Sequence, residues 1–166
     1  MEQPKAGHRQ LSDVQAKVVA LLDQVRRVAP EPFSGLGLIL YVAPVRMPIS
    51  DLGDQATFTP HLPVVGHDAI ARVLGQIATT TSPWHDGFHL IEASSWALTH
   101  VSQFVSPSVS DLKQARPLGA PVGARQLAAL AMSRLPSVET VAVLGARTDL
   151  MLCAKGVAIF ERGAAP

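Results

Sequence analysis

A carboxylate beside a glycine, within residues 83–88, is the first place where this sequence could do chemistry. The stretch falls between an expected helix and an expected strand, so Asp86 would be held by rigid structure while its oxygens stay open to solvent or a metal ion. Gly87 allows another backbone segment to approach closely behind the carboxylate. The same two residues are also frequent in ordinary turns, where they supply only local geometry. Asp86 is therefore either a catalytic or metal-binding carboxylate or a turn residue.

A glycine-containing loop that runs into a helix, residues 119–129, is the second candidate. The first N–H groups of a helix and the positive end of its dipole attract anions. Arg125, in the first turn, adds a planar set of donors that suits phosphate. A cation at that position is mildly unfavourable unless an anion compensates it. The pattern indicates a phosphate site, with an arginine on a solvated turn as the alternative.

Three histidines that lie close in sequence form the third candidate: His85, His89 and His100. With Asp86 they would make a zinc or manganese site and a small metal-dependent hydrolase, although no recognised ligand spacing supports this. The common phosphate-loop motifs GxxxxGK[ST] and GxGxxG are absent from the sequence. GxSxG is absent too, so a serine nucleophile elbow is not supported.

Hydrophobic periodicity places these candidates on a mixed set of elements. Residues 12–28, 67–78 and 123–134 have helical spacing, and Ser12 with Gln15 makes a capping box for the first helix. Short apolar runs predict strands at the ranges 36–42, 87–92, 96–105, 138–144, 150–154 and 157–161. Residues 44–65 and 106–122 are expected to be irregular, and residues 1–10 a flexible tail. The order predicts one α/β domain over residues 11–166, a mixed β-sheet with helices packed on its faces.

Composition limits the functions that the chain can have. It has 166 residues, of which 48% are hydrophobic and 16% charged, and a formal net charge of +1. Such a chain is globular and has no broad positive field for a nucleic-acid backbone. Its single cysteine, Cys153, sits in an apolar run and is expected to be buried. Without a signal-peptide core or a long apolar run, a cytoplasmic location and no membrane contact are expected.

The order of the motifs resembles the diadenylate cyclase domain, the family that includes the DNA-integrity-scanning cyclases. That family carries Asp-Gly-Ala at a strand start, then a hairpin and a proline-containing loop, then Gly-Thr-Arg-His-Arg opening a helix that is followed by strands. Here Asp86-Gly87-Phe88, a hairpin, the loop 105–108 and the helix start at 123–127 occur in the same order. The resemblance covers residues 67–161 and implies a diadenylate-cyclase-like core there.

In that family two domains face each other, each holding one ATP. The resemblance implies that Asp86 is the catalytic residue and the ligand of a divalent metal, Mg²⁺ or Mn²⁺, if the domain is catalytic. It also implies ATP or cyclic di-AMP as the partner, a homo-oligomer, and a role in bacterial signalling. The residues that it assigns to nucleotide binding are Gly87, Ser106, Gly123, Ala124, Arg125 and Gln126.

Several positions depart from the family pattern. Gln126 replaces the histidine, Leu127 the second arginine and Phe88 the alanine, and residues 145–147 read Gly-Ala-Arg where many members carry Ser-Glu-Glu. Each lost charge-assisted bond is worth about 1.5–3 kcal/mol. Arg147 would restore part of the charge if it faces the same site. We therefore expect a nucleotide-binding domain whose cyclase (nucleotidyltransferase) activity is weak or lost, with a non-catalytic sensory or interaction domain as the alternative.

Overall fold

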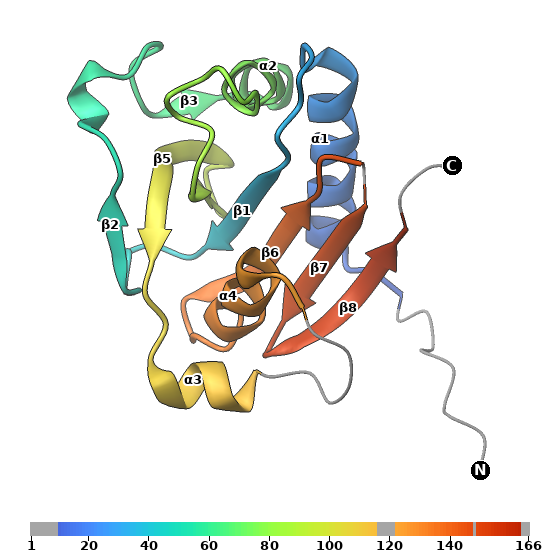
Figure 1. The fold of residues 1–166 in the computed structure, drawn as a ribbon. Helices are drawn as coiled ribbons and strands as arrows, with labels where there is room; N and C mark the ends of the chain where they lie inside the picture. The colour runs from blue at the N-terminus through green and yellow to red at the C-terminus, as the bar shows by residue number, and fades with distance from the viewer. Residues whose placement is uncertain (1–9, 116–121, 148, 164–166) are drawn as a thin grey trace.

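The computed structural model describes residues 10–115, 122–147 and 149–163. Helices and strands alternate along the chain, and Figure 1 shows them as one layered unit. The elements are α1 (Asp13–Val28), β1 (Leu36–Tyr41), β2 (Ile49–Asp51), the short 3-10 helix η1 (Gln55–Thr57), β3 (Val64–Val65), α2 (His67–Ile77), β4 (Phe88–Glu92), β5 (Ala97–Val105), α3 (Val109–Gln114), α4 (Ala124–Met132), β6 (Val138–Leu144), β7 (Leu150–Ala154) and β8 (Val157–Arg162).

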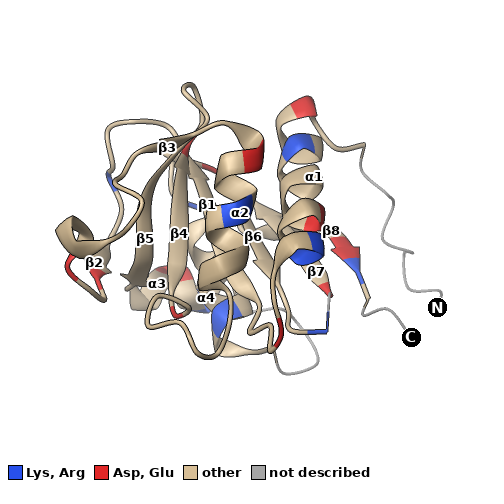
Figure 2. Cartoon of the chain, turned by 90° about the horizontal axis from the view of Figure 1, so that it is seen from above, with Lys and Arg blue, Asp and Glu red and all other residues tan. Residues whose placement is uncertain are grey.

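All the strands belong to one mixed sheet with helices on both faces. The strand order is β2-β5-β4-β1-β6-β7-β8, and β3 pairs with the outer side of β5. One buried cluster joins α1 and α2 to the first face, and a second joins α4 to the other. In Figure 1, α4 lies in front of β6 while α1 lies behind it. Seen from above in Figure 2, α1 and α2 run side by side, and basic and acidic segments alternate on them.

Strand direction decides which parts of the chain meet at each end of the sheet. β1 and β4 are parallel, with Gly37 opposite Phe88, whereas β6 runs antiparallel to β1, with Leu144 opposite Leu36. β7 starts at Leu150, opposite Leu144. The starts of β1, β4 and β7 and the end of β6 therefore share one end of the sheet, which we call the Asp86 end because Asp86 precedes β4 there.

Local sequence explains the first helix. The Ser12 side chain accepts a hydrogen bond from the Gln15 N–H, and Gln15 Oε1 accepts one from the Ser12 N–H, so the predicted capping box is present. Val18, Leu21, Leu22 and Val25 are at most 1% exposed, which is the apolar stripe that the helical spacing predicted. The helix ends before Pro30, which cannot continue it.

The predicted fold class is confirmed: a single α/β domain with a mixed sheet and helices on its faces. The hairpin between β4 and β5 and the antiparallel pairing of β7 with β8 are also as predicted. Two predictions were wrong. Residues 44–65 contain β2, η1 and β3, and residues 106–122 contain α3, whose Ser108 side chain accepts a hydrogen bond from the Asp111 N–H. The tail predicted at residues 1–10 lies, except for Gln10, outside the described residues.

Burial and helix length agree with the remaining sequence expectations. Cys153 is fully buried, and its burial, with the nearby Glu161 carboxylate, raises the pKa of the thiol to about 12. An inert core thiol is thus confirmed. Among the described helices, none combines the length and the apolar character that a membrane span requires.

Candidate functional site

Asp86 stands in the turn that leads into β4, with its side chain open to solvent. The carboxylate is 71% exposed, and its Oδ1 lies 3.8 Å from His85 Nε2. His85 is anchored in turn through Nδ1 to the Ser82 carbonyl oxygen. Because β4 begins two residues later at Phe88, the carboxylate sits on a short tether to a buried strand. That geometry leaves its oxygens available to a ligand from outside.

Gly87 occupies a position where any side chain would be strained. Its φ is +78°, in the left-handed region, and a Cβ added there would lie 2.4 Å from the Gln103 carbonyl oxygen. Close backbone approach behind Asp86 is therefore confirmed, and β5 is the segment that approaches. The glycine thus serves the packing of the sheet, whatever the neighbouring carboxylate binds.

The start of α4 carries the second set of predicted residues. Gly123 is the N-cap and provides no side-chain cap, but Gln126 Oε1 accepts a hydrogen bond of 3.2 Å from the Gly123 N–H. Ala124 is exposed and Arg125 is half-buried. The Gly123 donor is thus already occupied within the helix, so a bound phosphate would have to displace Gln126 to use it. Arg125 remains as the charged donor of this turn.

Topology brings the start of α4 to the Asp86 end. α4 packs on β6 and β7, and the chain turns back directly from its last residues into the first residues of β6. Since β6 runs towards the Asp86 end, the N-terminus of α4 lies at that end. Electrostatics agrees with this placement: burial and, to a smaller extent, the Arg125 guanidinium lower the pKa of His89 to about 3.

His89 is a buried polar residue at this end, as are Ser102 and Gln103. Its imidazole is 0% exposed, and Nδ1 accepts a 3.2 Å hydrogen bond from the Ser102 N–H. The neutral ring therefore carries its hydrogen on Nε2, and Nε2 finds no hydrogen-bond partner among the described residues. Such an uncompensated donor costs free energy in a protein interior.

The three histidines do not converge on one point. His85 binds the Ser82 carbonyl oxygen, His89 accepts from Ser102, and His100 Nδ1 pairs with Thr99 Oγ1 at 2.9 Å. Within the described ranges, no group of three or more His, Cys, Asp or Glu side chains is arranged to hold a metal ion. A lone Asp86 suits Mg²⁺ or Mn²⁺ only where substrate phosphates complete the coordination.

Two exposed apolar side chains that the sequence interpretation missed lie at the Asp86 end of the sheet. Leu52 is 51% exposed, and its Cδ1 would lie 3.0 Å from a Cβ at Gly87. Phe104 is 53% exposed and follows Gln103, the residue opposite Phe88. The sequence signal that could have revealed them was Phe104, an aromatic residue at an outward-facing position near the end of β5. Ser106 lies just beyond, exposed, with its N–H donating to the Pro48 carbonyl oxygen at 2.9 Å.

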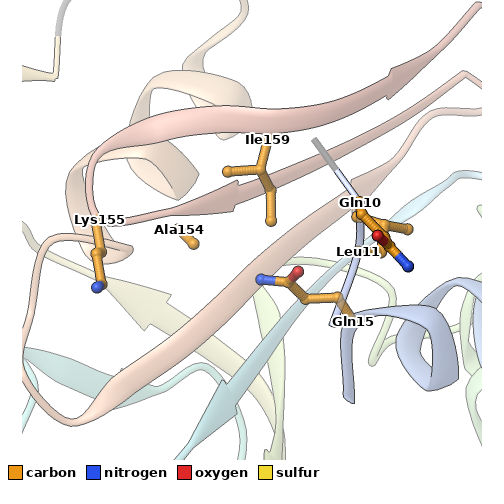
Figure 3. Close-up of a pocket in the computed structure, with 6 residues that line it drawn as sticks. All are labelled: Gln10, Leu11, Gln15, Ala154, Lys155 and Ile159. Atoms are coloured by element: carbon orange, nitrogen blue, oxygen red, sulfur yellow. The ribbon is translucent and has the colours of Figure 1, made fainter. Parts of the chain in front are cut away.

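Two of the cavities in the described part of the chain lie at opposite ends of the sheet. One of about 220 Å³ opens beside the start of α4. It is lined by Gln126, Asp149, Leu150, Met151, Glu161 and Arg162. The other, of about 260 Å³, lies between the start of α1 and the β7–β8 hairpin, and Figure 3 shows its lining of Gln10, Leu11, Gln15, Ala154, Lys155 and Ile159. Of the predicted site residues, Gln126 lines the first cavity.

Comparison with known proteins gives a structural likeness but no sequence match. No family model matches the sequence, and no curated protein matches it. Among solved structures, the chain is similar to a crystal structure of a double mutant of DacA from Staphylococcus aureus. The sequence identity is 14%, the TM-score is 0.49, and the match covers 89% of this chain and 84% of that one. A likeness at this level is too loose to transfer a residue or an activity.

Proposed function

We propose that this chain is a nucleotide-binding domain of the diadenylate-cyclase-like kind, taking ATP or cyclic di-AMP at the Asp86 end, with little or no cyclase activity. The fold supports the proposal: α4 packs on β6 and β7 and leads into the start of β6, and β6 runs towards the Asp86 end, so the first turn of α4, with Arg125, is at the end of the sheet where Asp86 precedes β4. In this proposal, Asp86 supplies a carboxylate and Arg125 a guanidinium to one ligand, although they are some forty positions apart in sequence.

The charge at the start of α4 supports an anionic ligand. Arg125 lies in the first turn, where the helix dipole disfavours a cation, so a bound phosphate would remove that conflict. The β6–β7 turn also lies at this end and contributes the exposed Arg147. Asp149 and Glu161 line the neighbouring cavity and offset part of this charge. The site therefore offers a moderate positive charge to an anionic ligand.

The apolar border of the turn supports a ligand with a flat organic part. Leu52 and Phe104 each expose roughly half of their surface; Leu52 lies against Gly87, and Phe104 follows Gln103, which pairs with Phe88. Stacking of a base on an aromatic side chain is worth about 1–3 kcal/mol. A base that stacks on Phe104 would use the apolar part of this end of the sheet.

Catalysis is where the chain falls short of the family pattern. Asp86 would hold the metal ion that brings charge neutralisation to a nucleotide α-phosphate, but Gln126 is committed to capping α4. Leu127, in the place of the second arginine, offers no charge at all. Stabilising a leaving pyrophosphate requires positioned positive charge. Binding without efficient turnover follows from these residues.

A titration with ATP tests the proposal. Wild-type protein should bind ATP, and Arg125→Ala should weaken binding by about 1–3 kcal/mol, or roughly five- to 150-fold in Kd. Arg72→Ala, on α2 at the other face of the sheet, is the matched control and should leave Kd unchanged. Equal ATP affinity in the wild type and Arg125→Ala would contradict the proposed site.

Thermal shift with separate ligands distinguishes the alternatives. Stabilisation by ATP or cyclic di-AMP favours nucleotide binding, since a ligand of the native state alone raises its stability. Stabilisation by Mn²⁺ alone would favour the metal-dependent hydrolase. A protein that responds to none of the three would be the interaction domain.

A further inference from the structure

Ser102 has a backbone conformation that its position in a strand does not predict. It lies inside β5 at a φ of +48°, in the left-handed region, although it is not a glycine. The register between β4 and β5 shifts on both sides of Leu90, so the ladder is interrupted by bulges at this point. A strained, buried residue beside a candidate site calls for a compensating set of contacts.

Each polar group of Ser102 binds a different segment. Its N–H donates to His89 Nδ1 on β4 at 3.2 Å, and its hydroxyl donates to the Trp84 carbonyl oxygen at 2.6 Å. Its own carbonyl oxygen accepts from the Leu52 N–H at 2.9 Å. Ser102 is 1% exposed, so water does not compete for these bonds. One residue thereby joins β4, the turn before Asp86 and the segment after β2.

The Trp84 bond matters most for the site because Trp84 is two residues before Asp86. The indole is fixed on its other side, packing edge-to-face on Phe58 with ring centroids 5.2 Å apart. A Cβ at Gly53 would lie 2.9 Å from the same indole. With Trp84 held by Ser102 and by this packing, the backbone that carries Asp86 has little freedom to move.

His89 Nδ1 supplies the hydrogen-bond acceptor for the Ser102 N–H, which the bulge turns away from the β4–β5 ladder. The bulged Ser102 N–H points to a side chain, and a buried donor left without an acceptor costs about 1–3 kcal/mol. An apolar residue at position 89 would fit the surrounding core, which is built from Leu38, Ile91 and Leu98 on this face. The imidazole is therefore explained by its bond to Ser102.

We propose that Ser102 and His89 are positioning residues that hold the Asp86–Gly87 turn in its ligand-binding geometry. This rests on the proposed nucleotide binding at the Asp86 end and assigns to it two residues that touch no ligand themselves. Loss of either bond lets the turn relax, so the affinity for nucleotide falls while the sheet remains folded.

The experiment compares four variants of the full chain by ATP titration and amide hydrogen exchange. Ser102→Gly accommodates the positive φ and removes the CH2OH side chain with its hydroxyl, and His89→Leu removes the acceptor. Each should weaken ATP binding by about tenfold or more, the effect of losing a buried positioning bond. Both should also speed exchange at residues 84–88. His89→Asn, whose Oδ1 takes the place of Nδ1, should restore the affinity to within about threefold.

Ser133→Ala is the matched control. Ser133 is 2% exposed, and its hydroxyl donates to Leu130 and accepts from the Gly156 N–H. It follows the last residue of α4, at the far end of the sheet, so its loss should lower stability and leave ATP affinity unchanged. Unchanged affinity and exchange in Ser102→Gly would overturn the inference. Failure of the wild-type protein to bind ATP would count against the proposed function. The positioning role is tested separately: unchanged hydrogen exchange at residues 84–88 in Ser102→Gly and His89→Leu, compared with the wild type, would refute it.

Discussion

Lowering the pH from about 7.5 to about 5.0 is expected to destabilise this domain through His89. The folded imidazole stays neutral because burial, helped by Arg125, lowers its pKa to about 3, whereas the ordinary value is 6.5. Its geometry agrees, since a proton on Nδ1 would face the Ser102 N–H. Between these two pKa values the unfolded chain binds one more proton than the folded chain. The free energy of unfolding is therefore fully retained above pH 6.5 and falls as the pH drops towards 3.

The size of the effect follows from that difference. At about pH 5 the medium lies one and a half units below the unfolded pKa, and each unit corresponds to about 1.36 kcal/mol, so His89 accounts for about 2 kcal/mol. Glu92 does not interfere in this interval. Hydrogen bonds from Ser95 and then Ser94 lower its pKa to about 2, so its contribution is present above 4.5 and is lost only below that pH. Burial lowers the pKa of His100 as well, which adds a smaller term of the same sign.

Urea unfolding followed by circular dichroism at the two pH values measures the loss. His89→Asn keeps the acceptor but does not titrate, so its stability should fall by about 2 kcal/mol less than that of the wild type over the same interval. The His100 contribution is common to both proteins and cancels in the comparison. Identical pH dependence in the two proteins would mean that His89 is protonated in the folded state at pH 5. The assignment of a neutral, buried imidazole would then be wrong.

Two further predictions concern the turn and the chemistry. Gly87→Ala should lower the free energy of unfolding by about 2–4 kcal/mol, because residue 87 has a positive φ and a Cβ there would clash with the Gln103 carbonyl oxygen. Gly123→Ala should change the free energy of unfolding by less than about 1 kcal/mol. Chemical denaturation of both variants measures the two losses, and equal losses would contradict this prediction. Incubation of purified protein with ATP and Mg²⁺ or Mn²⁺ should give little or no cyclic di-AMP by chromatography. Robust turnover abolished by Asp86→Asn would show that another residue, with Arg147 first in line, supplies the missing charge.

The parts of the fold that sequence predicted well have strong local signals. The capping box at Ser12 and the apolar stripe of α1 needed no tertiary information, and the buried strands stand out as apolar runs. The missed elements lack such signals. β2 and β3 are three and two residues long and lie among prolines, and α3 is a six-residue helix with no buried side chain. Pairing with β5 creates those two strands, and no period in their own sequence reveals it.

The candidate site divides in the same way. Asp86, Gly87 and Arg125 stood out as candidates because their residue types and order are informative, and the topology puts the start of α4 at the end of the sheet where β4 begins. Ser102 was not found, because its φ of +48° arises from the register shift between β4 and β5. A serine in an apolar strand carries no local sign of that conformation.

The distribution of buried polar residues bears on the choice between a ligand-binding domain and an inert scaffold. Seven polar or charged side chains are buried in the described part of the chain, and His89, Ser102 and Gln103 are three of them. These three lie together on β4 and β5 beside Gly87, where Gln103 also binds Asp51 at 2.6 Å. A scaffold would gain stability from apolar residues there, since the His89 Nε2 donor has no hydrogen-bond partner in the part of the chain that the structure describes. Buried polar residues and strained backbone that are confined to one region of an otherwise regular fold are typical of functional sites. The polar, strained β4–β5 junction therefore favours a ligand at the Asp86 end over a domain that keeps only the fold.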